Sequence, residues 1–250
     1  MINISGISDM NALGKLLRFP LKLIPQKMIM PILQGRLKGK KWIVGSSNHG
    51  CWLGSYEYDK QILFSRTIKE GGVVYDIGAN VGFYTLLSSE TVGKKGKVIV
   101  FEPLPRNIHY LRKHLLLNRC ENVTLIEAAV ADKNGVAFFE DRTGYSTAHL
   151  SSEGHLEVKV VSLDKLVIDG TIPPPDYMKI DVEGAELLVL SGARSILANY
   201  HPTIFLATHG IEVHQQCCEF LEAIGYDLQS INGKNIDETD EILAFKKAKE

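Results

Sequence analysis

The run from Asp76 to Gly82, Asp-Ile-Gly-Ala-Asn-Val-Gly, limits the fold of this chain more than any other feature. It follows the apolar residues 73–75, which favour a buried strand, and it precedes a segment with helical periodicity that starts at Phe83. Glycines at such a junction let the backbone approach a ligand closely, and a helix N-terminus offers free N–H groups to an anion. The sequence therefore predicts a nucleotide-type ligand at the carboxyl end of a buried strand.

Strands and helices alternate after this junction, which predicts an α/β fold with a mostly parallel seven-stranded sheet and helices on both faces. Apolar runs predict the seven strands at 73–76, 97–101, 123–130, 177–180, 203–207, 226–231 and 241–246. Helices are predicted at 83–90, 108–117, 217–224 and, with a break near Gly192, 185–197. Two further strand-like runs, 136–140 and 156–163, flank a polar segment and predict an inserted hairpin with a long loop at 141–154.

The first 70 residues differ in charge from the rest. Eight basic residues and one acidic residue precede Gly50, so this part carries +7 (8 − 1), whereas the whole chain carries −1. Prolines at positions 20, 25 and 31 interrupt the segment. We expect two parts: a basic, helical N-terminal extension and cap over residues 1–70, with a short strand at 41–44 and a helix at 58–69, and a Rossmann-like domain over residues 71–250.

Charge and composition narrow the choice of partners and location. A net charge of −1 argues against a nucleic-acid partner, and no apolar run reaches the roughly 20 residues of a membrane-spanning helix. The four cysteines form neither a C-x-x-C pair nor a zinc-binding spacing, which favours reduced thiols in a cytoplasmic protein. The basic N-terminus is interpreted either as a cap with a solvated face or as a weak peripheral contact with an anionic membrane surface. The oligomeric state stays open.

The glycine spacing distinguishes two kinds of cofactor. A dinucleotide fingerprint needs G-x-G-x-x-G, whereas Gly78 and Gly82 read G-x-x-x-G. Asp76 would repel a pyrophosphate, but it would suit the cationic amino group of S-adenosyl-L-methionine. Asn80 and Thr85 are expected to donate hydrogen bonds to the carboxylate of that cofactor.

Two further strand ends complete the expected cofactor site. Glu102 follows the strand at 97–101, and an acid at this point can accept hydrogen bonds from both ribose hydroxyls. Ala128 and Ala129, at the end of the strand at 123–130, are small enough to let an adenine ring lie against the backbone. The predicted cofactor residues are therefore Asp76, Gly78, Asn80, Gly82, Thr85, Glu102, Ala128 and Ala129.

Three residues are candidates for the chemistry. Asp181 and Glu183 follow the strand at 177–180, and His209 follows the strand at 203–207. Methyl transfer to a hydroxyl requires a group that accepts the hydroxyl proton. Asp181 is the first candidate and His209 the second, whereas Glu183 either orients one of them or caps the next helix. These side chains are compatible with a divalent metal, but no ligand spacing demands one, so no metal is predicted.

These segments resemble the FkbM family of methyltransferases. The resemblance rests on residues 74–84 (VYDIGANVGFY), 101–103 (FEP), 161–164 (VSLD) and, most specifically, 179–186 (KIDVEGAE). It implies a Rossmann-like class I methyltransferase fold, S-adenosyl-L-methionine as methyl donor, and an oxygen of a sugar, glycan or polyketide-type small molecule as acceptor. It supports Asp76, Gly78, Asn80 and Glu102 as cofactor residues and leaves the base unassigned.

The same resemblance concerns two flanking segments. It places Glu57, in the run 52–57 (WLGSYE), near the cofactor entrance, and it matches the loop around 144–146 to the variable region of the family. We expect that loop to select the acceptor. Two alternatives stand beside the methyltransferase hypothesis: a catalytically silent module that binds S-adenosyl-L-methionine, and an NAD-dependent oxidoreductase on the same fold.

Overall fold

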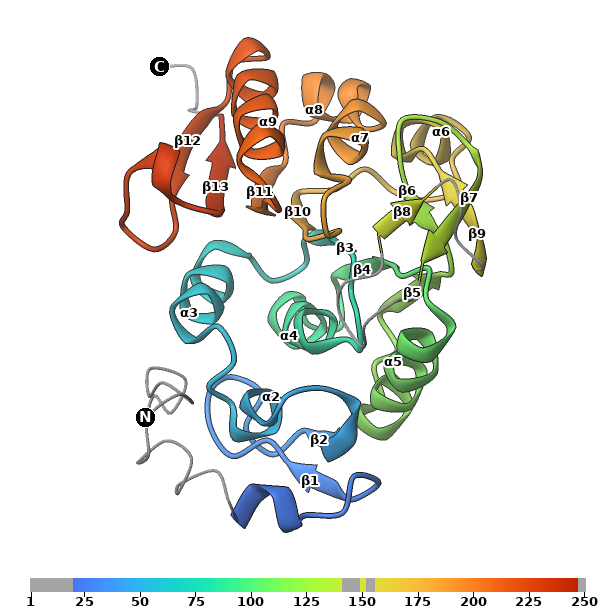
Figure 1. The fold of residues 1–250 in the computed structure, drawn as a ribbon, viewed down its shortest axis with the longest axis vertical. Coiled ribbons are helices and arrows are strands. Elements are labelled where there is room, and N and C mark those ends of the chain that lie inside the picture. Colours follow the sequence, from blue (N-terminus) through green and yellow to red (C-terminus); the bar gives the residue numbers. More distant parts are fainter. Residues whose placement is uncertain (1–19, 141–148, 152–155, 247–250) are drawn as a thin grey trace.

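The computed structural model describes residues 20–140, 149–151 and 156–246 (Figure 1). Residues 1–19 of the basic extension lie outside this part of the chain, and so does the loop around 144–146 that we expect to select the acceptor. None of the helices in the described part combines the length and the apolar character that crossing a bilayer requires.

The central sheet has seven strands and is mostly parallel, as predicted. In chain order the strands are β3 (Val73–Ile77), β4 (Lys97–Phe101), β5 (Val123–Ile126), β10 (Tyr177–Ile180), β11 (Thr203–Ala207), β12 (Asp227–Ser230) and β13 (Glu241–Phe245). Their spatial order is β12-β13-β11-β10-β3-β4-β5, and β13 runs opposite to the other six strands, so its pairs with β11 and β12 are antiparallel. After β3 the chain adds β4 and β5 along one edge of β3, and it then adds β10, β11, β13 and β12 along the opposite edge. The switch point between β3 and β10 is where open α/β sheets bind ligands.

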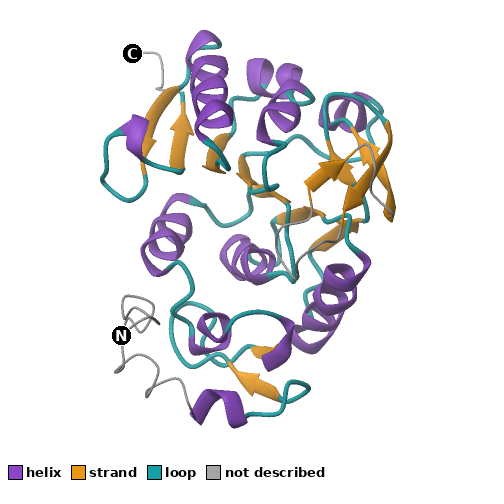
Figure 2. Ribbon diagram, viewed as in Figure 1, coloured by secondary structure: helices purple, strands orange, loops and turns teal. Residues whose placement is uncertain are grey.

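Helices cover both faces of this sheet (Figures 1 and 2). One face carries α3 (Tyr58–Thr67), α4 (Phe83–Val92) and α5 (Pro105–Asn118), and the other carries α7 (Glu186–Ser191), α8 (Arg194–Asn199) and α9 (Ile211–Ala223). Side chains alternate along each strand, so Val74 packs in the cluster with α4 while Tyr75 packs in the cluster with α7 to α9. Both clusters consist of closely packed apolar side chains, which makes the sheet a rigid base for the loops at its edge.

The third predicted strand, 123–130, is in fact two strands in two sheets. Strand β5 ends at Ile126, where the Ala128 N–H donates to the Ile126 carbonyl across a tight bend. The next strand, β6 (Ala129–Val130), joins β7 (Gly135–Glu140), β8 (His149–Ser151) and β9 (Leu156–Val161) in a separate four-stranded sheet. The predicted hairpin is therefore present as the antiparallel pair of β7 and β9, but β6 extends it.

The segment 156–163 also ends differently from the prediction. After Val161 the chain turns into helix α6 (Leu163–Ile168), which the sequence analysis missed. The Asp164 carboxylate accepts hydrogen bonds from the Ser195 and Ile196 N–H groups, 2.8 and 2.9 Å away, and so caps the start of α8. Helix α9 likewise begins at Ile211, well before the predicted start at 217.

The extension is less helical than predicted. Besides η1 (Pro20–Leu23), η2 (Val44–Ser46) and α2 (His49–Leu53), residues 20–57 contain an antiparallel pair of strands, β1 (Ile29–Pro31) and β2 (Lys41–Ile43). The physical reason is the spacing of prolines 25 and 31, which interrupt any helix by removing N–H donors. The fully buried Trp42 stacks on His114 of α5 at a ring-centroid distance of 3.9 Å. The extension thus packs directly on the helical layer of the domain.

The predicted helix at 185–197 breaks at Gly192 into α7 and α8, as expected. The Gly192 carbonyl accepts hydrogen bonds from the Asp164 N–H and the Ser162 hydroxyl, at 2.8 and 3.1 Å. A β-carbon at position 192 would overlap the backbone carbonyl of Ala131, which follows β6. Glycine is therefore needed here to let the α7–α8 corner pack against the second sheet.

This packing predicts that Gly192→Ala destabilises the protein by about 1–3 kcal/mol, the usual cost of overfilling a packed site. Gly135→Ala is the matched control, because a β-carbon there meets no atom within 4 Å. The control should change the free energy of unfolding by less than about 1 kcal/mol. Urea denaturation with an unchanged m-value measures both effects. Equal stability of the two variants would contradict the packing argument.

Candidate active site

A cavity lies at the carboxyl ends of β3, β4 and β10, at the switch point of the sheet. Its walls come from the loops that follow these strands, from the bend between β5 and β6, and from the extension. The predicted site residues that line it are Gly78, Asn80, Glu102, Ala128, Ala129, Asp181 and Glu183. Side chains from three separate strand ends therefore meet in one cavity, as the alternation of strands and helices predicts.

The loop between β3 and α4 approaches the end of β10 very closely. Gly78, at φ +76°, lies against the Asp181 carbonyl, which any β-carbon at position 78 would overlap. Asn80 also has a positive φ of 52°, a conformation that asparagine tolerates better than most residues. Gly82, in contrast, does not line the cavity. A β-carbon there would overlap Leu111 of α5, so this glycine serves the packing between two helices.

Glu102 is the best-defined cofactor candidate. Its buried carboxylate accepts hydrogen bonds from the Asn80 N–H at 2.7 Å, the Leu104 N–H at 3.0 Å and the Asn107 side-chain amide at 3.2 Å. Burial raises the pKa of Glu102 to about 7, although these three hydrogen bonds oppose the rise. Its position at the tip of β4 is the one from which an acid can reach a ribose.

The structure does not bring Asp76 and Thr85 to the cavity, contrary to the prediction. Both are fully buried, and the Thr85 hydroxyl donates to the Asp76 carboxylate at 2.6 Å. The alternation of side chains along β3 explains this, because Asp76 points with Val74 toward α4 and not out of the sheet edge. Asp76 and Thr85 therefore contact each other beneath the loop, and their predicted contacts with the amino group and carboxylate of the cofactor stay predictions.

Lys179 connects this buried pair to the chemistry end of the cavity. Its ammonium is 3.1 Å from Asp181 Oδ2 and 3.8 Å from Asp76 Oδ1, and it lies over the Tyr84 ring. Burial lowers the pKa of Lys179, but the two carboxylates raise it more, so the side chain stays charged. Burial raises the pKa of Asp181, but the charges of Lys179, Lys60 and His209 together outweigh this effect and keep the pKa below its ordinary value.

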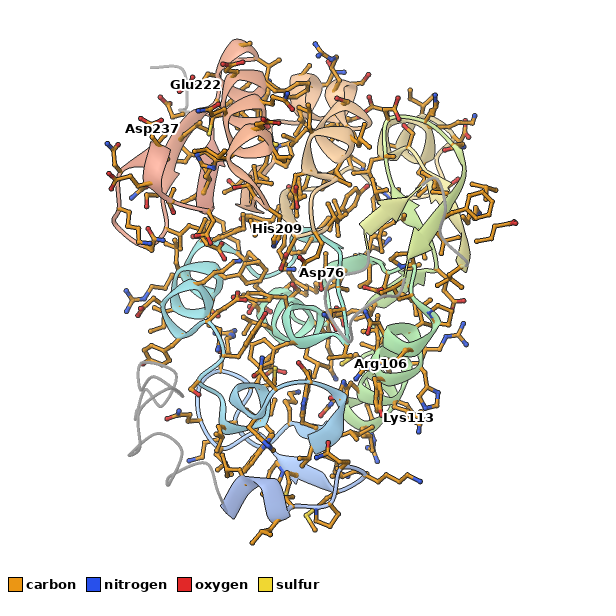
Figure 3. All side chains as sticks on the ribbon, viewed as in Figure 1. Asp76, Arg106, Lys113, His209, Glu222 and Asp237 are labelled. Atoms are coloured by element: carbon orange, nitrogen blue, oxygen red, sulfur yellow. The ribbon has the colours of Figure 1, made fainter. Side chains whose placement is uncertain are left out.

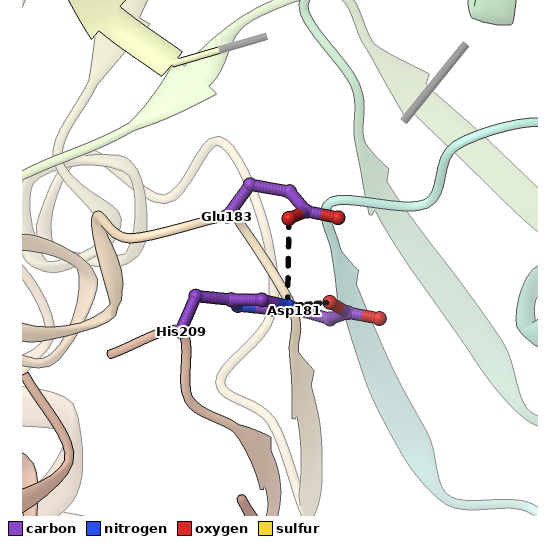
Figure 4. Close-up of side chains that lie close together, drawn as sticks. All are labelled: Asp181, Glu183 and His209. Atoms are coloured by element: carbon purple, nitrogen blue, oxygen red, sulfur yellow. Dashed lines mark ion pairs between the residues drawn. The ribbon is translucent and has the colours of Figure 1, made fainter. Parts of the chain in front are cut away.

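The three predicted catalytic side chains come together (Figure 4), near the middle of the molecule, where Figure 3 labels His209. His209 Nε2 is 3.7 Å from Asp181 Oδ1 and 3.5 Å from Glu183 Oε2. His209 Nδ1 is hydrogen-bonded to Glu186 Oε1 at 2.8 Å. This bond, followed in importance by the Glu183 and Asp181 charges, raises the pKa of His209 to about 9, although burial opposes it. Sequence spacing did not indicate that His209 would reach both acids.

The structure gives two residues supporting roles that the sequence pattern did not predict. Glu186, to which the sequence pattern assigned no catalytic role, is fully buried and orients the His209 ring. His114 of α5 was given no role, yet its Nδ1–H donates to the Val81 carbonyl at 2.8 Å and its Nε2 accepts the Ile43 N–H at 3.1 Å. The sequence signal for Glu186 was its place in the run 179–186, whereas nothing in the sequence pointed to His114.

Aromatic side chains form the wall on the side of the extension. Tyr56 and Tyr84 line the cavity, and the Tyr84 hydroxyl donates to Glu57 at 2.9 Å. Lys60 of α3 pairs with Glu57 at 3.3 Å and with Glu241 at 2.7 Å. Glu57, expected near the cofactor entrance, therefore lies behind the aromatic wall and holds it in place.

Comparison with known proteins places this geometry in a family. A family model described as the methyltransferase FkbM domain matches residues 76–245. Hexuronic acid methyltransferase AglP of Haloferax volcanii is 29% identical over 161 residues, which are 63% of this chain and 62% of that protein. The 31-O-demethyl-FK506 methyltransferase FkbM of Streptomyces tacrolimicus is 28% identical over 177 residues, 54% of this chain and 67% of that protein.

A solved structure supports the fold. The methyltransferase FkbM from Methylobacillus flagellatus KT superposes with a TM-score of 0.54 at 18% identity, over 80% of this chain and 55% of that one. The chain thus spans less than two thirds of AglP and of this solved relative. The family model covers more than half of the chain, including both the loop after β3 and the end of β10. The chain therefore belongs to the FkbM family of methyltransferase domains.

Proposed function

We propose that this protein transfers a methyl group from S-adenosyl-L-methionine to an oxygen of a sugar, glycan or polyketide-type acceptor. One observation carries the proposal: a single cavity joins the buried Glu102 at its cofactor end to Asp181 and Glu183 at its other end. Family membership supports the reaction type, because the matched region contains all three residues.

The cofactor end suits a nucleoside. In the proposed complex, Glu102 accepts hydrogen bonds from the ribose hydroxyls, and Ala128 and Ala129 contact the adenine ring. Asn80 and the close-packed backbone at Gly78 face the methionine part. Asp76 acts from beneath, because its bonds to Thr85 and Lys179 hold the loop and β10 in register.

The other end of the cavity suits proton removal. An acceptor oxygen attacks the methyl carbon in line with the sulfur, and the carbon–sulfur bond breaks with its electron pair going to sulfur, which becomes neutral. The hydroxyl proton needs an acceptor, and we assign that task to the cluster of Asp181, Glu183 and His209. Glu186 is a positioning residue in this scheme, since it orients the His209 ring.

The acceptor class is inferred from relatives. The name of AglP specifies a hexuronic acid, and the name of the Streptomyces tacrolimicus enzyme specifies the oxygen at position 31 of FK506. A hexuronic acid carries hydroxyl and carboxylate oxygens, so an oxygen nucleophile fits both names, and we carry that feature to this chain. All four cysteines are free thiols, which agrees with a cytoplasmic location as part of the proposal. An NAD-dependent activity is disfavoured by the glycine spacing and by the family.

Glu102→Gln is expected to weaken the binding of S-adenosyl-L-methionine about ten- to a hundredfold, because a charged acceptor of ribose hydrogen bonds is worth about 1.5–3 kcal/mol. Isothermal titration calorimetry measures the change. Glu127→Gln is the matched control, since Glu127 is an exposed acid in the bend between β5 and β6, next to Ala128. An equal loss in both variants, or none in either, would contradict the assignment.

The binding of a ribose by Glu102 should also depend on pH. The hydroxyls need the ionised carboxylate, and its pKa is about 7, so affinity should rise with pH through about 7 and fall below it. Methylthioadenosine is the suitable ligand, because it lacks the titrating amino group of the full cofactor. Calorimetry between about pH 6 and about pH 8 should show this trend in the wild type and lose it in Glu102→Gln. A trend that persists in the variant would assign it to another group.

Methyl transfer itself is tested with labelled S-adenosyl-L-methionine and a panel of hexuronic acid glycosides, neutral sugars and macrolides with a free hydroxyl. We expect one methyl group on an oxygen of at least one acceptor, detected by mass spectrometry. A product stable to mild alkali is an ether formed at a hydroxyl, whereas an alkali-labile product is an ester formed at a carboxylate. Binding without turnover on any acceptor class would favour the silent binding module.

A further inference from the structure

The cluster of Asp181, Glu183 and His209 has the arrangement of a cation site. One ligand atom from each residue lies within 4.8 Å of the other two. Figure 4 shows one edge of the His209 ring facing both carboxylates, which follow β10, while His209 follows β11. Asp181 and Glu183 also line the cavity, so an ion held here would be open to a ligand bound in it.

The distances from His209 to the two carboxylates fit joint binding of one ion better than direct hydrogen bonds. Charge-assisted hydrogen bonds between nitrogen and carboxylate oxygen measure about 2.7–2.9 Å. His209 Nε2 is instead 3.5 Å from Glu183 Oε2 and 3.7 Å from Asp181 Oδ1. Ligands that share one ion at bond lengths of about 2.0–2.2 Å lie about 3–3.6 Å apart. The two separations from His209 are within about 0.1 Å of this range, and the ligand atoms of Asp181 and Glu183 lie within 4.8 Å of each other, so an inward movement of the carboxylates would close the site around an ion.

Neighbouring groups orient two of the three ligands. The Nδ1 atom of His209 is engaged by Glu186, which leaves Nε2 toward the two carboxylates. Carboxylate partners on the second ring nitrogen are usual for metal-binding histidines. Lys179 binds Asp181 Oδ2 at 3.1 Å and leaves Oδ1 toward His209. The buried Glu186 carboxylate has a second oxygen without a hydrogen-bond partner in the described part of the chain, so positive charge nearby would be stabilising.

The backbone at Glu183 gives an independent sign of a functional constraint. This residue has a φ of 55°, which a non-glycine side chain adopts only at a cost of about 1–3 kcal/mol. Gly184 follows at φ +105°, and its N–H donates to Glu186 at 3.0 Å. The strained turn places Glu183 and Glu186 on either side of the same imidazole ring.

We propose that Asp181, Glu183 and His209 bind one divalent cation of the Mn²⁺ type. Two carboxylates favour a hard ion and the imidazole favours a transition metal, and Mn²⁺ satisfies both preferences. The ion would lower the pKa of an acceptor hydroxyl bound to it in the cavity, and a carboxylate oxygen of the cluster that does not bind the ion would take up the released proton. That role rests on the proposed function, whereas the binding of the ion does not.

The test is a titration of Mn²⁺ into chelator-treated wild-type protein, with free Mn²⁺ followed by electron paramagnetic resonance. We expect one saturable site, at least about tenfold weaker in His209→Ala and in Glu183→Gln. Glu212→Gln is the control for general charge, because Glu212 is exposed on α9 near His209 in sequence, and it should bind Mn²⁺ as the wild type does. No saturable binding, or equal binding in all variants, would overturn the proposal.

A second measurement needs no variant and so avoids any effect on folding. Electron spin-echo envelope modulation of Mn²⁺ on the wild type should show a nitrogen coupling from the imidazole, and its absence would also overturn the site. S-Adenosyl-L-methionine is titrated into the same chelator-treated protein by calorimetry. Cofactor binding without Mn²⁺ binding rejects only the metal site, whereas Mn²⁺ binding without cofactor binding supports the metal site and rejects the proposed function.

Discussion

Lys179 lies between Asp76 and Asp181, and this buried charge network ties the two halves of the site together. Asp76 and Lys179 are direct register partners on β3 and β10, the strands that flank the switch point. Burying these charges costs free energy, so the network contributes little to the stability of the fold. Its main effect is to fix one position of the loop after β3 relative to the end of β10. In that arrangement the Gly78 backbone lies against the Asp181 carbonyl, and the cofactor loop and the chemistry end cannot shift independently.

A second constraint acts on the loop from the helical side. His114 accepts a hydrogen bond from the extension through Ile43 and donates one to Val81 of the loop. Both contacts require the neutral ring, and burial lowers the pKa of His114 to about 4, which keeps it neutral. The extension is therefore part of the support of the cavity, and Tyr56 brings it to the cavity wall.

The two ends of the cavity differ in how their charges are balanced. Glu102 is held by three neutral N–H donors, so its burial is offset by hydrogen bonds alone. Among the described residues, three carboxylates lie around the His209 imidazole, Lys179 binds one of them, and Lys60 acts on Asp181 from further away. A group of carboxylates at this end suits an added cation, whether it is the sulfonium of the proposed cofactor, a metal ion or a proton.

The amino-acid sequence by itself determined the parallel strands, the junction at 76–82 and the position of Glu102, because these depend on local periodicity and on glycine conformations. It also indicated the break at Gly192. Only the tertiary structure decided that Asp76 and Thr85 turn beneath the loop, that β6 leaves the main sheet, and that Glu186 orients His209. These features depend on strand register and on contacts between residues far apart in the chain, and such contacts leave no periodic signal in the sequence.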